Sequence, residues 1–471
     1  MMGGETFGIN TDMTQTLDYD AFLQKRMHFG CNSGFEPLVM PGHLFGFQKD
    51  LVEWALLKGR AAIFADCGLG KTAMQLAWAE NVIRKTNKPV LILTPLAVGA
   101  QTVKEAAKFG HDAVRSLDGK HSGKVCVVAN YERLHYFDPS LFGGVVCDES
   151  SILKNADGAT KAAVTQFMLR VPYRLLATAT AAPNDFIELG TSSEALGYLG
   201  FQDMITKFFK KSEKTMSRKD ENRAGTWRFR GHSEQIFWKW VCSWARAIQR
   251  PSDMGYSDEG YDLPPVEYRE HIVNAETPPD GFLFALPACG LSEQRGERKR
   301  TLSERCELAA TLVNNTGKPF VSWCYLNSEG DLLAKLMPDA VQVSGADTDE
   351  RKEEVFTAFA DGQIRGIVSK PSIASFGMNW QHCAHQTFFP SHSFEQLYQA
   401  VSRSHRFGQT RQVVVDVITS EGEAEVMKNI RRKQIQAQQM FARLVELMHQ
   451  GESVTETRNH NTKIKTPSWL S

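Results

Sequence analysis

The sequence ADCGLGKT at 65–72 contains the residue types of a Walker A phosphate-binding loop. It follows an apolar run and precedes a helical pattern, which is the strand, turn and helix order that such a loop needs. Gly68 and Gly70 let backbone N–H groups close around a phosphate without an obstructing Cβ. Lys71 adds a positive charge for the outer phosphates, and Thr72 offers a hydroxyl to Mg²⁺ at a helix N-terminus. The pattern predicts ATP and Mg²⁺ binding, although alanine stands where the strict pattern has its first glycine.

A second candidate group is the pair of acids Asp148 and Glu149, at the end of the apolar run 145–147. This is the Walker B arrangement, in which Asp148 would hold Mg²⁺ and Glu149 would polarise the attacking water. An Asp-Glu pair at a strand end is common and is usually a solvated turn. The phosphate loop upstream in the same α/β pattern favours the catalytic interpretation.

The third candidate group lies far along the chain, where Gln399, Arg403 and Arg406 recur at i, i+4 and i+7. This spacing predicts a helix that presents all three side chains on one face. Two guanidiniums on that face could reach across a cleft to the γ-phosphate and act as arginine fingers. A lone pair of arginines at this spacing would instead be typical of a solvated surface helix.

The elements that must position these groups are short apolar runs that alternate with helical stretches. Near-continuous apolar runs indicate strands of a parallel sheet that is covered on both faces. The runs form two sets, so the fold class is α/β with two parallel-sheet domains. The first set is 61–64, 90–93, 125–128, 145–147 and 174–177, and the second is 320–324, 341–343, 364–368, 387–389 and 413–417.

The pattern divides the chain into six parts. Residues 191–318 lack the regular alternation and are expected to form a mainly helical insertion and linker between the two domains. The other parts are a polar N-terminal segment (1–35), the first domain (36–190), the second domain (319–420), a C-terminal helix (421–450) and a flexible tail (451–471).

Composition limits the partners of the whole molecule. Its 471 residues include 54 Lys and Arg against 54 Asp and Glu, so a surface for a polyanion must be local. The nine cysteines are scattered without a C-x-x-C pair, which indicates reduced thiols in a cytosolic-type compartment. The N-terminus has no apolar signal-peptide core, and the apolar run 90–100 is too short to span a bilayer.

One local charge asymmetry stands out, because residues 207–230 contain nine basic and three acidic side chains. Such a cluster could bind DNA phosphates without sequence preference, or it could be a solvated protrusion. The nearby Trp238, Trp240 and Trp244 have helical spacing and are expected in the core rather than stacked on bases. The candidate DNA contacts in the cluster are Lys207, Lys210, Lys211 and Lys214.

Several motifs resemble those of the Swi/Snf-type branch of the superfamily-two helicases, in family order. The sequence DESSILKN at 148–155 is similar to motif II, usually DEAHRxKN, with Ser-Ser in place of Ala-His. The sequence QAVSRSHRFGQT at 399–410 is similar to motif VI, QAxGRxHRxGQ, with Ser402 in place of glycine. Weaker likenesses are FGFQ at 45–48 to the Q motif, LTP at 93–95 to motif Ia, TATAAP at 178–183 to motif III and SFGMNWQ at 375–381 to motif V.

The resemblance implies two RecA-like lobes with ATP and Mg²⁺ in the cleft between them. It implies that Gln48 reads the adenine edge and that Thr94 and Pro95 touch the DNA backbone. The compact architecture is most similar to phage or prophage members, and hence implies a bacterial or phage-infected host cytoplasm. The full set of expected nucleotide-binding residues is Gln48, Gly68, Leu69, Gly70, Lys71, Thr72, Gly377 and Asn379.

The activity that the resemblance implies is a DNA-dependent ATPase that moves along duplex DNA and remodels it or displaces bound proteins. Three alternatives remain open. One is a strand-separating or branch-migrating helicase in replication or recombination, and another is the motor subunit of a restriction-like complex. The third is an ATP-switched clamp that binds DNA or a protein without travelling.

Overall fold

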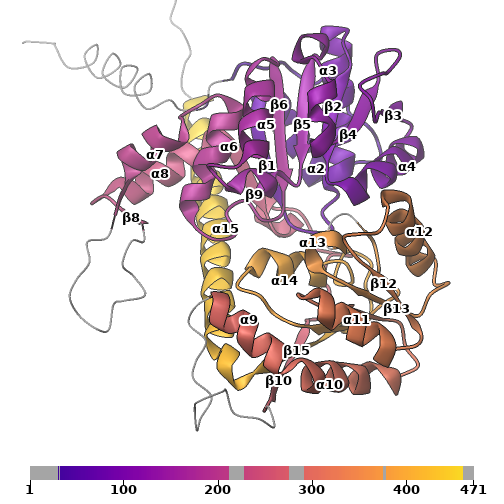
Figure 1. Ribbon diagram of the computed structural model, residues 1–471. Helices are drawn as coiled ribbons and strands as arrows, with labels where there is room; N and C mark the ends of the chain where they lie inside the picture. The colour runs from indigo at the N-terminus through magenta and orange to yellow at the C-terminus, as the bar shows by residue number, and fades with distance from the viewer. Residues whose placement is uncertain (1–29, 31, 212–226, 275–290, 375–377, 460–471) are drawn as a thin grey trace, which may run out of the picture.

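The apolar runs of the sequence form the strands of two parallel sheets, each in its own lobe (Figure 1). The computed structural model describes residues 30, 32–211, 227–274, 291–374 and 378–459. The two parallel sheets with their covering helices confirm the predicted α/β fold class with two lobes. The lobes lie one above the other in Figure 1, with the first lobe in indigo and magenta and the second mainly in orange.

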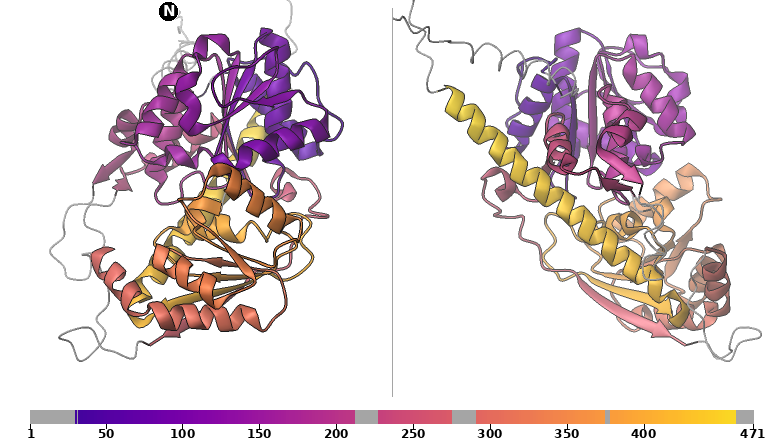
Figure 2. Two further views of the ribbon diagram at one scale, coloured as in Figure 1. Left: turned by 45° about the vertical axis from the view of Figure 1, so that its right-hand side comes forward. Right: turned by 90° about the vertical axis from the view of Figure 1, so that its left-hand side faces the viewer.

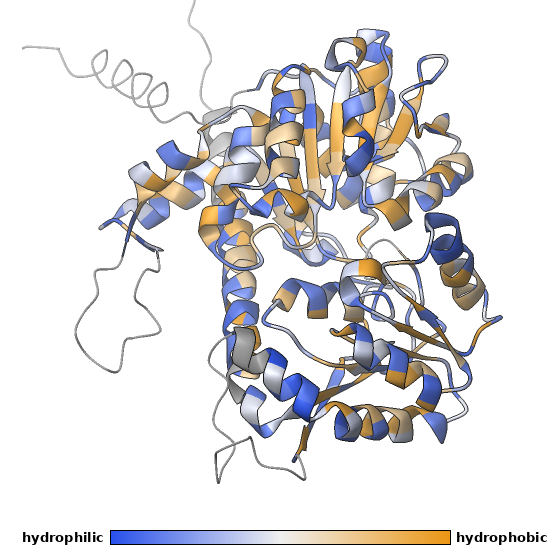
Figure 3. Cartoon of the chain, viewed as in Figure 1, coloured by the Kyte–Doolittle hydropathy of each residue, from blue (hydrophilic) through white to orange (hydrophobic). Residues whose placement is uncertain are grey.

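The sheet of the first lobe is parallel throughout and has the strand order β3-β4-β2-β5-β6-β1-β9. Five of its strands match the predicted apolar runs, and their orange ribbons in Figure 3 reflect that composition. The short edge strand β3 was not predicted, because its side chains are partly exposed and form no apolar run. The strands are β1 Arg60–Ala65, β2 Val90–Thr94, β3 Ala113–Arg115, β4 Cys126–Asn130, β5 Gly144–Asp148, β6 Tyr173–Thr178 and β9 Ala245–Ile248.

Helices cover both faces of this sheet, as a buried parallel sheet requires. Leu51 of α2, Trp78 of α3 and Ala106 of α4 pack in one hydrophobic cluster, and Val164 of α5 and Leu196 of α6 pack in another. The helices are α2 Gly46–Lys58, α3 Lys71–Thr86, α4 Gly99–Phe109, α5 Ala159–Leu169 and α6 Leu189–Leu196. Short 3₁₀ helices are η1 Leu96–Val98, η2 Tyr131–Tyr136, η3 Pro139–Leu141, η4 Ser150–Lys154 and η5 Phe186–Glu188.

The second lobe has a parallel sheet of order β10-β15-β14-β11-β13-β12. Its strands are β10 Glu267–Val273, β11 Phe320–Trp323, β12 Ala340–Val343, β13 Gly366–Ser369, β14 His385–Phe388 and β15 Val414–Ser420. All five apolar runs expected in this lobe are strands. The helices are α9 Leu291–Arg300, α10 Leu302–Asn314, α11 Asn327–Leu336, α12 Asp349–Ala360, α13 Pro371–Ala374 and α14 Phe394–Val401.

Residues 191–318 differ from the expected helical insertion, because they also supply a strand to each sheet. Strand β9 pairs with β1, and β10 pairs with β15, so the connection between the lobes is built into both sheets. The sequence EYREHIV of β10 has no apolar run, since this strand lies at an exposed edge. The remaining elements are α7 Phe201–Phe208, α8 Ser233–Cys242, the antiparallel pair β7 Phe209–Lys211 and β8 Trp227–Phe229, and η7 Pro251–Met254.

A long helix, α15 (Ala424–Asn459), follows η8 (Glu421–Glu423) and runs diagonally past both lobes (Figure 2). Its first turns bury Val426 and Ile430 in the core of the second lobe. Later turns bury Phe441 and Leu444 in the core of the first lobe. The helix extends beyond the predicted end at 450, so the first residues of the expected flexible tail are helical.

The tryptophans of α8 and the loop after it lie in the core of the first lobe, as predicted. Trp240 and Trp244 are fully buried, and Trp238 is nearly so. Over the part of the chain that the structure describes, none of the helices combines the length and the apolar character needed to cross a bilayer.

Candidate nucleotide-binding and catalytic cleft

The phosphate loop joins β1 to α3 and depends on two glycines in the left-handed region. Gly68 has φ 90° and Gly70 has φ 77°, and Gly70 directly precedes the first residue of α3, Lys71. A side chain at either position would be strained there. The Lys71 ammonium donates hydrogen bonds to the carbonyls of Ala65 and Asp66, at 3.0 and 3.3 Å. Lys71 and the N-terminus of α3 therefore present positive charge at the same loop.

Gln48 supports this loop from α2. Its Nε2 donates to the Leu69 carbonyl at 2.9 Å, and its Oε1 accepts from the Phe45 amide at 3.0 Å. A Cβ at Gly70 would lie 2.4 Å from the Gln48 Nε2, so a side chain there would force this amide to shift from its contact with Leu69. The side-chain amide of Gln48 was expected to read the adenine edge. Here its nitrogen and its oxygen both form hydrogen bonds with the protein's own backbone. Leu69 is buried behind the loop.

The acids lie at the carboxyl end of β5, next to the phosphate loop. Asp148 ends the strand, and the backbone of Glu149 turns sharply away with φ 51°. The Asp148 Oδ1 accepts from Gln75 Nε2 at 2.6 Å, and its carbonyl accepts from the Tyr131 hydroxyl at 2.7 Å. The Glu149 Oε2 accepts from the Thr178 hydroxyl at 3.2 Å. Three side chains therefore hold the two acids in place, of which Thr178 belongs to the stretch resembling motif III, whereas Gln75 and Tyr131 were not indicated by the sequence patterns.

The charge state of this pair suits a divalent cation. Burial, reinforced by the neighbouring Glu149, raises the pKa of Asp148 to about 6. Two adjacent buried carboxylates repel each other, and a cation would relieve that repulsion. Oxygen donors from Asp148 and the Thr72 hydroxyl are of the kind that Mg²⁺ prefers. The donor set therefore fits the expected ion.

The predicted helix through Gln399, Arg403 and Arg406 is wrong in its extent, because α14 ends at Val401. Beyond it the chain continues as a turn in which the His405 amide donates to the Val401 carbonyl at 3.0 Å, while the Arg403 carbonyl accepts from the Trp380 amide at 2.9 Å. Both arginines nevertheless converge, since each guanidinium donates to the Met378 carbonyl, at 3.3 and 3.2 Å. Burial, with Arg403 adjacent, lowers the pKa of Arg406. The turn after α14 brings the two positive groups together.

These groups meet at one cleft between the lobes, with a cavity volume of about 540 Å³. Gln399 is excluded from the lining, since it is buried against the first lobe, where its Nε2 lies 3.5 Å from the Thr180 hydroxyl. Gly377 lies outside the described residues. The predicted residues that line the cleft are Gln48, Gly68, Gly70, Lys71, Thr72, Asp148, Glu149, Asn379, Arg403 and Arg406.

Three aromatic side chains at the same cleft were not predicted as part of the site. Tyr261 of the linker lies 4.7 Å from Phe407 and 6.1 Å from Phe45, measured between ring centroids. Phe45 and Phe407 are exposed, and all three residues line the cavity. Such flat apolar surfaces can stack on a nucleobase. Phe45 and Phe407 stand within the stretches 45–48 and 399–410, which could have indicated them, whereas Tyr261 carries no local signal of this arrangement.

The candidate DNA contacts lie apart from the cleft. Thr94 ends β2 and is fully buried, so its side chain is not available to a ligand, whereas Pro95 is half-buried. Lys210 and Lys211 are exposed on β7, which pairs with β8 at the left edge of Figure 1. Lys207 is on α7, and burial lowers its pKa. Lys214 lies outside the described residues.

Comparison with known proteins adds a distant likeness to solved structures. No protein-family model matches the sequence, and no curated protein matches it. Among solved structures, one similar chain is the Sulfolobus solfataricus SWI2/SNF2 ATPase core in complex with dsDNA. The two are 17% identical with a TM-score of 0.40, and the likeness covers 86% of this chain and 96% of that one. At this distance, a role for the cleft has to be argued from the residues of this chain.

Proposed function

We propose that this chain is a Mg²⁺-dependent ATPase that uses the free energy of hydrolysis to move along double-stranded DNA. One observation carries the proposal. The cleft lined by Lys71, Thr72 and the acids of the first lobe is also lined by Arg403 and Arg406 of the second lobe. A triphosphate bound there would touch both lobes, so its binding and hydrolysis would change how the lobes sit together.

In this proposal, each side chain acts on charge or geometry. Lys71 and the loop amides bind the outer phosphates, and Thr72 and Asp148 hold Mg²⁺, which neutralises phosphate charge. Glu149 orients the attacking water, and Thr178 keeps its carboxylate in place. Arg403 and Arg406 stabilise the charge that develops in the transition state.

Movement requires that each lobe also grips the nucleic acid. Lys210 and Lys211 are exposed cations on an otherwise neutral molecule and suit sequence-independent phosphate contacts. If the grips of the two lobes alternate as the cleft opens and closes, the protein advances along the duplex. We propose that such movement remodels DNA or displaces proteins bound to it.

The test is ATP hydrolysis without nucleic acid and with single-stranded DNA, duplex DNA or RNA. We expect strong stimulation by duplex DNA that is lost in Lys71→Ala and Arg403→Ala. Arg351→Ala is the matched control, because Arg351 forms an exposed ion pair on α12 away from the cleft. Stimulation by single strands or RNA alone, or none at all, would contradict a duplex motor.

Two further assays separate movement from its alternatives. Displacement of a triplex-forming strand placed far from the entry site requires travel along the duplex. A clamp would bind DNA in ATP yet leave that triplex intact. Processive release of one strand from forked and blunt duplexes would instead indicate a strand-separating helicase.

A further inference from the structure

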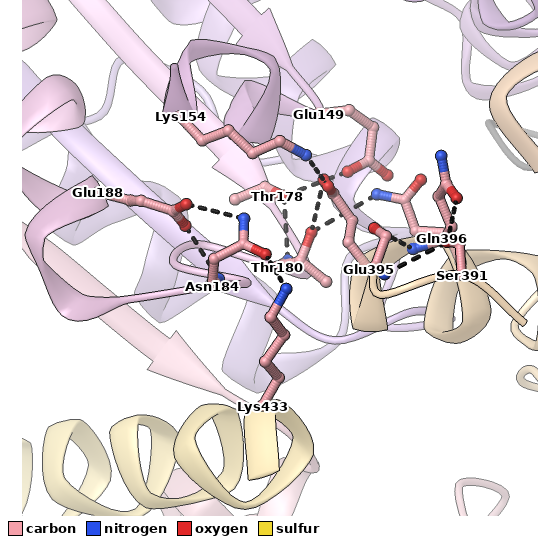
Figure 4. A network of polar contacts seen from close by, with 12 residues as sticks. Glu149, Lys154, Thr178, Thr180, Asn184, Glu188, Ser391, Glu395, Gln396 and Lys433 are labelled. Atoms are coloured by element: carbon pink, nitrogen blue, oxygen red, sulfur yellow. Dashed lines mark hydrogen bonds and ion pairs between the residues drawn. The ribbon is translucent and has the colours of Figure 1, made fainter. Parts of the chain in front are cut away.

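Glu395 is a buried carboxylate of the second lobe whose partners are in the first lobe (Figure 4). It lies in the first turn of α14 and is only 5% exposed. One oxygen, Oε2, pairs with the ammonium of Lys154. The other, Oε1, accepts from the Thr180 hydroxyl at 3.4 Å. A single side chain thus connects the two lobes beside the catalytic cleft.

Both partners belong to segments that flank the candidate catalytic acid. Lys154 ends the 3₁₀ helix η4, which begins directly after Glu149. The amide of Thr180 donates to the Thr178 hydroxyl at 3.0 Å, and that hydroxyl donates to Glu149. Glu395 therefore contacts two segments next to Glu149: η4, which follows it in the chain, and the turn after β6, where Thr178 donates to its carboxylate.

In the second lobe, Glu395 is connected to Arg403 through the helix α14. The helix α14 that bears it ends two residues before Arg403. One turn along this helix, Gln399 also reaches Thr180, and its carbonyl accepts from the Arg403 Nε at 3.0 Å. A shift of α14 against Thr180 would consequently move Arg403 relative to Glu149.

The strength of this connection comes from burial of the carboxylate. The Glu395 side chain is 7% exposed, whereas that of Lys154 is 34% exposed. Removing Lys154 would therefore leave the Glu395 charge buried and uncompensated. Another ion pair between the lobes joins Arg115 to Glu353 at 3.3 Å, and its carboxylate side chain is 45% exposed. Water and salt weaken such a pair, so it fixes the lobes far less.

We propose that Glu395 is a positioning residue that sets the register of the two lobes, aligning Arg403 and Arg406 with Glu149 across the bound phosphates. It touches no reacting atom and acts through Lys154 and Thr180. This inference rests on the proposed ATPase function, and it assigns the alignment of that site to a residue outside the resembled motifs.

The test compares Glu395→Gln, Lys154→Met, the double variant and the exchanged pair Glu395→Lys with Lys154→Glu. We expect Glu395→Gln to lower kcat for ATP about tenfold to a hundredfold while KM changes less than about twofold, because misalignment affects the chemical step. The double variant should be no worse than the more impaired single variant, and the exchanged pair should recover part of kcat. Glu353→Gln, the same change in the exposed pair between the lobes, should have little effect.

Three kinetic results would overturn the proposal. They are additive losses in the double variant, an equal loss in Glu353→Gln, and faster turnover in Glu395→Gln. Faster turnover would mean that the pair restrains closure instead of aligning the site. Equal melting temperatures of Glu395→Gln and Glu353→Gln would show that a difference in kcat does not come from unfolding.

A second readout separates this proposal from the ATPase itself. If the wild-type chain hydrolyses no ATP, the proposed function fails, but the contact between the lobes can still be measured. Small-angle X-ray scattering without nucleotide should then show a larger radius of gyration for Glu395→Gln and Lys154→Met than for Glu353→Gln. Identical scattering from all three would show that Glu395 does not hold the lobes in register.

Discussion

At the scale of single residues, Gln48 and Gly70 illustrate how a side chain outside the phosphate loop shapes it. The amide of Gln48 fills the space where a side chain at position 70 would lie. Gly110, at the end of α4, has nearly the same left-handed backbone, with φ 76°, but no neighbour near its Cβ position. A substitution at Gly110 therefore tests backbone strain alone, whereas the same substitution at Gly70 tests backbone strain together with the steric clash with Gln48.

We expect Gly70→Ala to impair both stability and ATP binding, whereas Gly110→Ala should cost only about 1–2 kcal/mol of stability from left-handed strain. The larger effect at position 70 arises because Gln48 must move and release the Leu69 carbonyl. Thermal melting and nucleotide-binding titrations measure both effects. Adding Gln48→Ala should restore part of the loss, and a Gly70→Ala protein that behaves like Gly110→Ala would contradict the steric argument.

His405 is a residue whose effect depends on pH. Its Nε2–H donates to the Pro264 carbonyl of the linker at 2.9 Å, and burial lowers its pKa below the ordinary value of 6.5. The unfolded chain therefore takes up a proton first as the pH falls. The stabilising contribution of neutral His405 is complete above pH 6.5 and is lost as the pH falls through the lower pKa of the folded state.

The matching variant is His405→Gln, whose amide can donate to Pro264 but does not titrate. We expect the free energy of unfolding of the wild type, relative to this variant, to decrease when the pH falls from 7.5 to about 5. Other titrating groups cancel in the difference, so denaturant unfolding at several pH values measures the effect. A difference independent of pH would show that burial of His405 has no such role.

At the scale of elements, Arg174 joins two helices to the sheet of the first lobe. From β6, its guanidinium donates to the carbonyls of Val171, Leu169 and Leu196, at 2.7–2.9 Å. Leu169 and Leu196 are the last residues of α5 and α6, whose terminal carbonyls have no partner within the helix. Burial lowers the pKa of Arg174 to about 10.

We expect Arg174→Met to lower the free energy of unfolding by about 3 kcal/mol or more, because it leaves buried carbonyls without donors. Arg174→Lys should fall between this variant and the wild type, since an ammonium cannot span the three carbonyls as the planar guanidinium does. Urea unfolding measures both. Equal stability of the Met variant and the wild type would mean that water satisfies the helix ends.

At the scale of the whole molecule, α15 connects the cores of the two lobes outside the cleft (Figure 2). Lys433, the tenth residue of this helix, donates to the Asn184 Oδ1 of the first lobe and to the His392 carbonyl of the second, both at 2.7 Å. Figure 4 shows this contact beside the Glu395 network. The lobes are thus joined by a polar contact next to the site and by the buried apolar side chains of α15 outside the cleft.

We expect Leu444→Ala to lower the free energy of unfolding by about 2–5 kcal/mol, because Leu444 is 1% exposed in the core of the first lobe. Ile435→Ala on the same helix is the control, since Ile435 is 54% exposed. Hydrogen exchange should increase at α8 and β9, which α15 contacts. Similar decreases in the free energy of unfolding for both variants would show that helix propensity, and not packing in the core, determines the contribution of this helix.

A neutral molecule that binds DNA must do so through local charge. We expect Lys210→Ala with Lys211→Ala to weaken duplex binding and to reduce the slope of log affinity against log salt by about 2, since about one counterion is released per phosphate contact. Fluorescence anisotropy at several salt concentrations measures the slope. Lys335→Ala with Lys352→Ala on the second lobe is a charge-matched comparison. An unchanged slope in the β7 variant would remove this strand from the proposed interface.

The features that could be predicted were those encoded over short stretches of chain. Apolar runs marked all the inner strands of both sheets, because a buried parallel strand must be apolar on both faces, and they also marked the edge strand β12. Residue type alone marked two parts of the site. The glycines beside Lys71 indicated the phosphate loop, and the acids after an apolar run indicated the pair that begins at Asp148. The exposed edge strand β10 was missed because its pairing with β15 decides it. The early end of α14 was also missed, and there the Arg403 carbonyl accepts from the distant Trp380 amide.

The sequence by itself determined the two-lobe α/β fold and the residue types available at its cleft, because periodicity and turn chemistry act between near neighbours. Only the tertiary structure decided which distant groups meet. Lys154 and Glu395 are 241 residues apart and become partners when two lobes exclude water between them. The contact of Gln48 with Gly70 arises in the same way, as do the hydrogen bonds from Arg174 to the ends of α5 and α6. Such contacts depend on which buried surfaces pack together, and no local pattern carries that information.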